Sequence, residues 1–128
     1  MIPELTYLVY GVILLIAHIV VQASLSDLSK GLGWALGPQD DNRDQNVIAD
    51  RVQRALRNYL ETFVAYVALA LLLAVTEKSS ATSTLGAAIW FWARVAYVPA
   101  FAFGIPLLRS GIWFVSIAGL VLMILAAL

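Results

Sequence analysis

Four long runs of uncharged residues constrain this chain more than any other feature of its sequence. They cover residues 5–26, 62–76, 79–108 and 110–128, and only Arg94 interrupts the third. A helix needs roughly 20 apolar residues to cross about 30 Å of hydrocarbon, so the second run must begin earlier, near Asn58. We predict an all-α integral membrane protein of one domain, with spans at about 5–26, 58–76, 82–105 and 110–128.

The composition agrees with a membrane location. The chain of 128 residues is 62% hydrophobic and 12% charged, whereas a soluble chain is about half apolar and about a quarter charged. The net charge of zero gives no electrostatic footprint for nucleic acid. The absence of cysteine and the single histidine predict no metal site.

Basic residues predict the orientation of the spans. Five of the eight Lys and Arg residues lie between residues 24 and 57, and Arg109 follows the third span, whereas the connection after the second span holds only Lys78. Lys and Arg favour the cytoplasmic side, so both termini are expected on the opposite side of the membrane. Turn formers predict a loop at about 27–50, with helix resuming near Val47. The expected fold is an antiparallel four-helix bundle.

The strongest polar signal lies at the start of the second span. Arg51, Arg54, Asn58 and Glu61 are spaced by three and four residues, which places them on one helix face. One interpretation is a solvated helix end whose arginines, including Arg57, reach the headgroups. An amide and a carboxylate cannot do this, so we expect Glu61 and the nearby arginines to form a buried, mutually satisfied network.

The third span carries a second polar group, Arg94, which needs a partner in hydrocarbon. Glu61 and Asp27 are the candidates, and a structural ion pair between helices is the alternative to a binding role. From Arg94 the same face continues through Tyr97 toward Arg109. Together with the stripe of the second span, these residues suit a small polyanionic ligand, because arginines fork onto carboxylates.

The first span has one buried stripe at intervals of seven residues, formed by Glu4, Gly11, His18 and Leu25. We expect His18 to be hydrogen-bonded within the core rather than catalytic. In the third span, Pro99 has no N–H and leaves the carbonyl of Val95 without its helical donor.

The sequence resembles a known family at these residues. The run from Arg51 to Glu61, the segment Ala93–Tyr97 and the pair Arg109 and Ser110 are similar to the membrane-associated proteins in eicosanoid and glutathione metabolism (MAPEG), and within them to microsomal glutathione transferases. The likeness covers nearly the whole chain.

The resemblance implies a homotrimer. It also implies that glutathione, as co-substrate, binds between neighbouring subunits near the cytoplasmic face. We expect the membrane to be a bacterial cytoplasmic membrane. The resemblance assigns Arg109 to the glutathione thiolate. The glutathione-binding residues that we expect from the resemblance and the helix faces are Arg51, Arg54, Arg57, Asn58, Glu61, Arg94 and Tyr97.

Two departures from the family pattern leave two functions open. Phe101 and Trp113 stand where some members of the family carry tyrosines, and neither side chain has a hydroxyl. The first function is a membrane-embedded, glutathione-dependent transferase or peroxidase acting on lipophilic electrophiles or hydroperoxides. The alternative is a non-catalytic trimeric membrane binding or scaffold protein of the same fold. In both cases membrane lipid is a partner.

Overall fold

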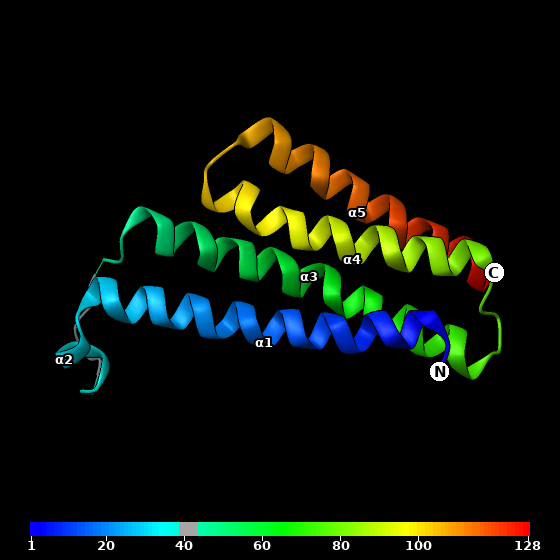
Figure 1. Cartoon of the computed structure of the whole chain (residues 1–128), viewed down its shortest axis with the longest axis horizontal. Coiled ribbons are helices and arrows are strands. Elements are labelled where there is room, and N and C mark those ends of the chain that lie inside the picture. Colours follow the sequence, from blue (N-terminus) through cyan, green and yellow to red (C-terminus); the bar gives the residue numbers. More distant parts are fainter. Residues whose placement is uncertain (39–43) are drawn as a thin grey trace.

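The four apolar runs form long helices. The computed structural model describes residues 1–38 and 44–128; in these, α1 (Pro3–Lys30), α3 (Val47–Val75), α4 (Ala81–Ala102) and α5 (Pro106–Ala127) lie side by side, and α2 (Leu32–Ala35) is one short turn at one end of the bundle (Figure 1). Each long helix is long and apolar enough to span a membrane. The protein is therefore a multi-pass membrane protein, and its two termini lie at the same end of the bundle (Figure 1).

Local sequence explains where the helices begin. Proline occupies the first turn of α1 and of α5, where a missing N–H costs nothing. The side chain of Asn46 caps α3 by accepting from the Ala49 N–H at 2.8 Å. Ser80 and Ser83 form a reciprocal capping box at the start of α4.

The first connection is shorter than the expected loop at 27–50. α1 continues through Lys30, α2 follows directly, and α3 begins at Val47. Gly31 ends α1 at this point, because its φ of 101° is one that few other residues adopt. Arg43, one of the five basic residues counted above, lies outside the described residues. The second connection is the turn that includes Glu77, with a φ of 55°.

The buried seam of α1 departs slightly from the expected interval of seven residues. Glu4, Gly11 and His18 are buried as predicted, but the fourth buried position is Ser26 instead of Leu25. A straight helix of 3.6 residues per turn drifts by about 20° for every seven residues, so a seam that starts at Glu4 has moved by about one position after three intervals. α1 therefore packs as a straight helix.

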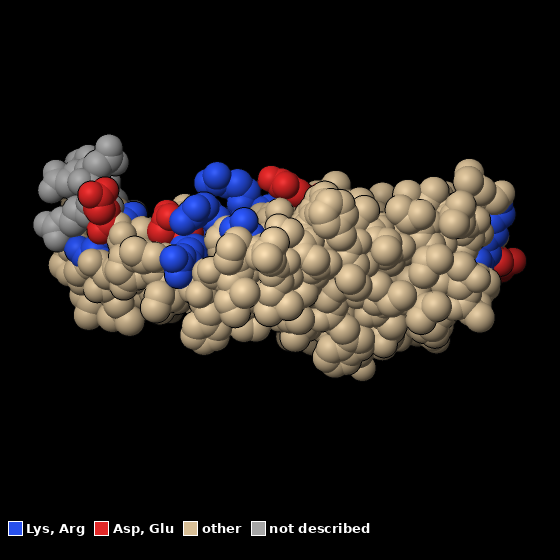
Figure 2. Space-filling model, turned by 90° about the horizontal axis from the view of Figure 1, so that it is seen from above, with Lys and Arg blue, Asp and Glu red and all other residues tan. Residues whose placement is uncertain are grey.

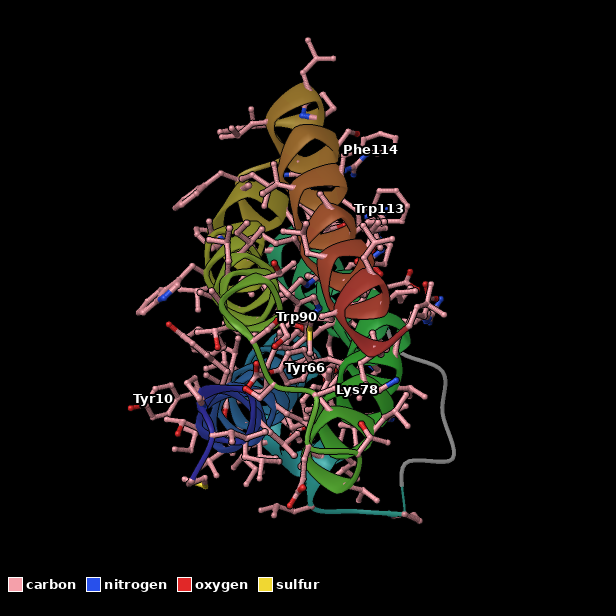
Figure 3. The ribbon with its side chains drawn as sticks, turned by 90° about the vertical axis from the view of Figure 1, so that its right-hand side faces the viewer. Tyr10, Tyr66, Lys78, Trp90, Trp113 and Phe114 are labelled. Carbon is pink, nitrogen blue, oxygen red and sulfur yellow. The ribbon has the colours of Figure 1, made fainter. Side chains whose placement is uncertain are left out.

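Aromatic side chains fill the centre of the bundle. The rings of Tyr66 and Trp90 stack with centroids 4.2 Å apart, and both residues are fully buried between α3 and α4 (Figure 3). The hydroxyl of Tyr59 donates to the Gly11 carbonyl, and that of Tyr66 to the Glu4 carbonyl, each at 2.6 Å. These two hydrogen bonds fix α1 against α3.

Glycines bring α4 and α5 into backbone contact. A Cβ on Gly86 would lie 2.5 Å from the Gly119 carbonyl oxygen, and a Cβ on Gly119 would lie 2.6 Å from the Gly86 oxygen. Any side chain at either position would therefore force the helices apart.

Charged side chains gather at one end of the molecule. Figure 2 shows them mainly over the end where α1 finishes and α3 begins, with a small group at the opposite end and an uncharged stretch between. Large apolar side chains such as Ile13, Val64 and Leu125 are exposed along that stretch. This distribution fits a lipid environment around the middle of the bundle and water at its ends.

Candidate functional site

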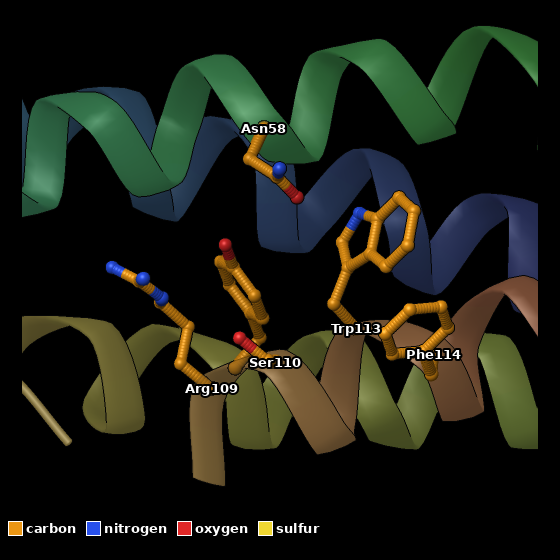
Figure 4. Close-up of a pocket in the computed structure, with 6 residues that line it drawn as sticks. Asn58, Arg109, Ser110, Trp113 and Phe114 are labelled. Atoms are coloured by element: carbon orange, nitrogen blue, oxygen red, sulfur yellow. The ribbon is translucent and has the colours of Figure 1, made fainter. Parts of the chain in front are cut away.

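Three helices meet at a small pocket near the charged end. The cavity has a volume of about 130 Å³ and is lined by Asn58 of α3, Tyr97 of α4, and Arg109, Ser110, Trp113 and Phe114 of α5 (Figure 4). Asn58 points from α3 across the gap toward α5 (Figure 4). Its Oδ1 atom is buried and has no hydrogen-bond partner. The pocket thus combines a free amide oxygen with a guanidinium and two hydroxyls.

The structure brings three predicted residues together here, namely Asn58, Tyr97 and Arg109. Arg109 is half-buried, and its guanidinium lies 4.9 Å from the ring centre of Phe101. It reaches the pocket because Pro106 starts α5 and places Arg109 in the first turn of that helix. An arginine held against an aromatic face keeps its N–H groups available for an anion.

Sequence reasoning missed two residues that line the pocket, Ser110 and Phe114. The pair Arg109 and Ser110 was visible as part of the family resemblance, yet nothing in the spacing marked the hydroxyl as a lining group. Trp113, which stands where some members of the family carry a tyrosine, also lines the pocket.

Arg94 is the most unusual charged group near the site. Only 1% of the residue is exposed, and none of its three guanidinium nitrogens has a hydrogen-bond partner. The guanidinium lies 4.1 Å from the ring centre of Tyr97 and 5.8 Å from that of Tyr59. The expected pairing with Glu61 or Asp27 is therefore wrong: the cation is held between aromatic faces, directly behind a residue that lines the pocket.

The expected buried network around Glu61 is also wrong for the single chain. Glu61 is exposed, as are Arg54 and Arg57, and the one ion pair found among residues 1–38 and 44–128 joins Arg54 to Asp50 at 2.8 Å. The physical reason is the rotation of α3. The side chains that face the bundle are those of Val52, Ala55, Tyr59 and Thr62, each one residue after a member of the polar stripe.

Arg51 and Arg54 have partners within the chain. Arg51 donates to the Ala102 carbonyl at 3.5 Å, at the end of α4, and packs against Gly104, whose φ is 70°. The guanidinium of Arg54 lies 5.8 Å from the ring centre of Phe101. Neither residue lines the pocket of the single chain, although both lie at the same end of the bundle.

The pocket can receive only part of a ligand. Its volume of about 130 Å³ is smaller than the roughly 300–1,000 Å³ of typical small-molecule sites. Its chemistry suits a small anionic molecule with amide groups, because the Asn58 amide can pair with a peptide group and Arg109 with a carboxylate or a thiolate.

Comparison with known proteins gives one match. The sequence model of the MAPEG family matches residues 7–128 of this chain. No curated protein and no solved structure matches. The family match covers nearly the whole chain and includes every residue of the pocket.

Proposed function

This chain belongs to the MAPEG family, and from that premise we propose that it is a membrane-embedded, glutathione-dependent transferase or peroxidase of the microsomal glutathione transferase type, acting on lipophilic electrophiles or hydroperoxides. The observation that carries the proposal is the meeting of Asn58, Tyr97 and Arg109, from three helices, in one pocket at the charged end of the bundle. A tripeptide thiol with two carboxylates matches that set of groups.

Each residue has a distinct part in the proposal. Arg109 supplies positive charge that favours the thiolate over the thiol. Asn58 and Tyr97 hold peptide groups of glutathione, and Arg94 supplies a second cation behind Tyr97. In a conjugation, the thiolate sulfur attacks an electrophilic carbon and the leaving group departs with its electron pair. In a peroxidase reaction, two thiols reduce one hydroperoxide to an alcohol and water and form a disulfide.

The proposal includes a homotrimer with the glutathione site between neighbouring subunits. Two observations support it: the cavity of the single chain is too small for a tripeptide, and Glu61 is exposed on a helix that spans the membrane. A neighbouring subunit would enlarge the site and shield this carboxylate and the stripe of Arg51, Arg54 and Arg57. Light scattering of the purified protein is expected to give three chains per particle, and a monomer would contradict this arrangement.

A second candidate function is a non-catalytic trimeric membrane binding or scaffold protein. Phe101 favours it, because this buried ring lies beside Arg109 at 4.9 Å and has no hydroxyl to donate. A lost hydrogen bond to a charged ligand costs about 1.5–3 kcal/mol, which is roughly a tenfold to hundredfold loss of affinity or thiol activation.

Glutathione binding and thiolate formation separate the two functions. We expect calorimetry to detect glutathione binding to the purified protein, and ultraviolet absorbance to detect a bound thiolate below the solution pKa of the thiol. Arg109→Ala should abolish the thiolate signal and the conjugation of an aryl halide, whereas Lys78→Ala, which removes a cation at the opposite end, should change neither. Binding without a thiolate signal in the unmodified protein favours the scaffold function, and no binding at all contradicts both.

The proposed orientation places both termini on the non-cytoplasmic side of a bacterial cytoplasmic membrane. It rests on the basic residues of the first and third connections. Cysteines introduced at the exposed positions Asp44 and Thr82 should react with a membrane-impermeant reagent from opposite sides of sealed vesicles. Labelling of both positions from the same side would contradict the orientation.

A further inference from the structure

The lining of the candidate pocket is aromatic at one end. Three of the six described residues that line it are aromatic, and none of the six is aliphatic. Figure 4 shows Arg109 at one end of the pocket and the rings of Trp113 and Phe114 at the other. We call Trp113 and Phe114 the aromatic wall. The proposed function uses Arg109, Asn58 and Tyr97 and leaves the aromatic wall without a role.

A cavity beside α1 shows that such a lining is not general in this bundle. It has a volume of about 270 Å³ and is lined by aliphatic side chains together with His18 and Pro99, and none of the described residues around it is a lysine or an arginine. His18 is 4% exposed, its ring centre lies 6.1 Å from that of Tyr59, and neither ring nitrogen makes a hydrogen bond of ordinary geometry. The histidine is therefore buried as predicted, but the expectation that it is hydrogen-bonded is wrong.

The aromatic wall keeps ring surface available to a ligand. The Tyr97 ring centre is already flanked by the Arg94 guanidinium at 4.1 Å and by the Phe101 ring centre at 5.7 Å. The ring centres of Trp113 and Phe114 lie 5.0 Å apart at an interplanar angle of 78°, an edge-to-face pair that leaves at least one face of each ring uncovered by the other. Trp113 is half-buried and Phe114 is 65% exposed, so the wall continues from the pocket to the outer surface of α5.

The aromatic wall lies within reach of the proposed thiolate. Arg109 and Trp113 are four residues apart on α5, so they share one helix face and are separated by about 6 Å along the axis. A ring that is bonded to the sulfur directly or through one carbon spans that step. Because α5 begins at Pro106, the aromatic wall lies further from the charged end than Arg109. A substrate dissolved in the lipid arrives from that side.

We propose that the electrophile taken by this site is aromatic: its ring packs against Trp113 and Phe114 while its reacting carbon faces the thiolate beside Arg109. Aromatic rings attract one another in edge-to-face and offset-stacked pairs beyond the effect of their apolar area, which an aliphatic group does not match. This aromatic specificity rests on the proposed glutathione function, because the thiolate defines where the reacting carbon lies.

The reaction with a benzylic halide illustrates the arrangement. The glutathione thiol first loses its proton to water. The thiolate sulfur then forms a bond to the benzylic carbon, and the halide leaves with the electron pair of the broken carbon–halogen bond. The product carries its ring one carbon away from the sulfur, in position to contact the aromatic wall.

Two glutathione conjugates that differ only in the saturation of one ring test the proposal on the full chain in lipid nanodiscs. S-benzylglutathione carries an aromatic ring, and S-(cyclohexylmethyl)glutathione carries the saturated ring of the same carbon skeleton. The saturated ring is at least as apolar, so burial of apolar area alone would give it equal or tighter binding. We expect calorimetry to give S-benzylglutathione a dissociation constant about threefold to tenfold lower.

Variants assign the preference to Trp113. Trp113→Leu keeps an apolar side chain without the ring and should bring the two dissociation constants together, whereas Trp113→Phe should keep most of the preference. Trp92→Leu is the matched control, because Trp92 is a 59% exposed tryptophan on α4 that does not line the candidate pocket, and it should keep the full preference. The readout is a ratio of two affinities within each variant, so a general loss of glutathione affinity cancels.

Failure of the aromatic specificity is distinct from failure of the enzyme function. Equal or weaker binding of the benzyl conjugate by the unmodified protein would contradict an aromatic site, and this comparison needs no variant to fold. A full preference in Trp113→Leu would contradict the role of Trp113 and leave it as an anchor of α5 at the membrane interface. In either case, aryl halide conjugation by the same preparation would show that the glutathione function stands. If neither conjugate binds and no conjugation occurs, the glutathione function is wrong and the aromatic specificity falls with it.

Discussion

Glu4 and Arg94 are both buried charged residues in the same bundle, yet their surroundings are opposite. The carboxylate of Glu4 accepts hydrogen bonds from Ser79 at 2.8 Å, from Thr84 at 3.2 Å and from Ser83, at the start of α4. The guanidinium of Arg94 makes none and touches two aromatic rings. Glu4 is 0% exposed and Arg94 is 1% exposed, so burial alone does not distinguish them.

The difference separates a charged residue whose partners lie within the chain from one that has no polar partner within it. A buried charge is costly unless hydrogen bonds replace water, and Glu4 meets that condition within the chain. It also lies where the partial positive charge of the α4 N-terminus favours an anion. Arg94 does not meet the condition, and its guanidinium is shielded behind Tyr97, so it can act on a ligand in the pocket through its positive charge. We infer that Glu4 contributes stability and Arg94 contributes affinity.

The largest expected effect is on stability at Glu4. Glu4→Ala should lower the free energy of unfolding by about 3 kcal/mol or more, because hydrogen bonds to a charged group are worth about 1.5–3 kcal/mol each. Thermal unfolding of the purified protein measures this as a lower Tm. The matched control is Glu77→Asn, which removes an exposed carboxylate at the same end and keeps a residue that tolerates positive φ. Equal Tm values for the two variants would remove the structural role of Glu4.

Arg94 tests the other half of the comparison. Arg94→Met should leave the free energy of unfolding within about 1 kcal/mol of the original value or raise it, because an apolar side chain replaces a buried charge that has no partner. Glutathione affinity, measured by calorimetry, should fall by roughly tenfold, because the variant removes a positive charge close to the pocket. A loss of stability as large as that of Glu4→Ala, with unchanged binding, would reverse the assignment.

A smaller effect is expected at Phe101, next to the site. Phe101→Tyr adds one hydroxyl close to Tyr97 and Arg109. The ring centres of Phe101 and Tyr97 are 5.7 Å apart, and the Arg109 guanidinium lies 4.9 Å from the Phe101 ring centre. Under the enzyme proposal, the rate of aryl halide conjugation should rise by up to about tenfold, the effect of 1.4 kcal/mol in the transition state. Phe103→Tyr adds a hydroxyl to an exposed ring and should leave the rate unchanged. A rise in both variants, or in neither, would argue against a hydroxyl at position 101 acting on the thiol.

The sequence predicted the helices well because their length and apolar content depend on local residues. The start of α3 at Val47 follows from Asn46 as a cap and from the turn formers before it. The rotation of α3 about its axis could not be predicted in the same way. One residue corresponds to about 100° on a helix, so the stripe of Arg51, Arg54, Asn58 and Glu61 and the buried stripe beside it differ by a single step.

The sequence predicted which residues form the candidate site better than it predicted the contacts that they make. Asn58, Tyr97 and Arg109 meet as expected, because helical spacing brings them to the same end of the bundle. The partners of Arg94 and His18 could not be predicted, since they depend on which aromatic rings and carbonyls the neighbouring helices present. The contribution of Ser110 depends on the exact turn at which α5 begins.

The contact between Gly86 and Gly119 fixes the position of α5 against α4 at one point. The two backbones touch there, so α5 cannot shift sideways at that point without a clash. Arg109 lies ten residues from Gly119, about 15 Å along the helix, and Gly104, with a φ of 70°, forms the turn beyond it. A small tilt of α5 about this contact would therefore move Arg109 and Ser110 more than it moves Gly119, and it would change the width of the pocket that they line.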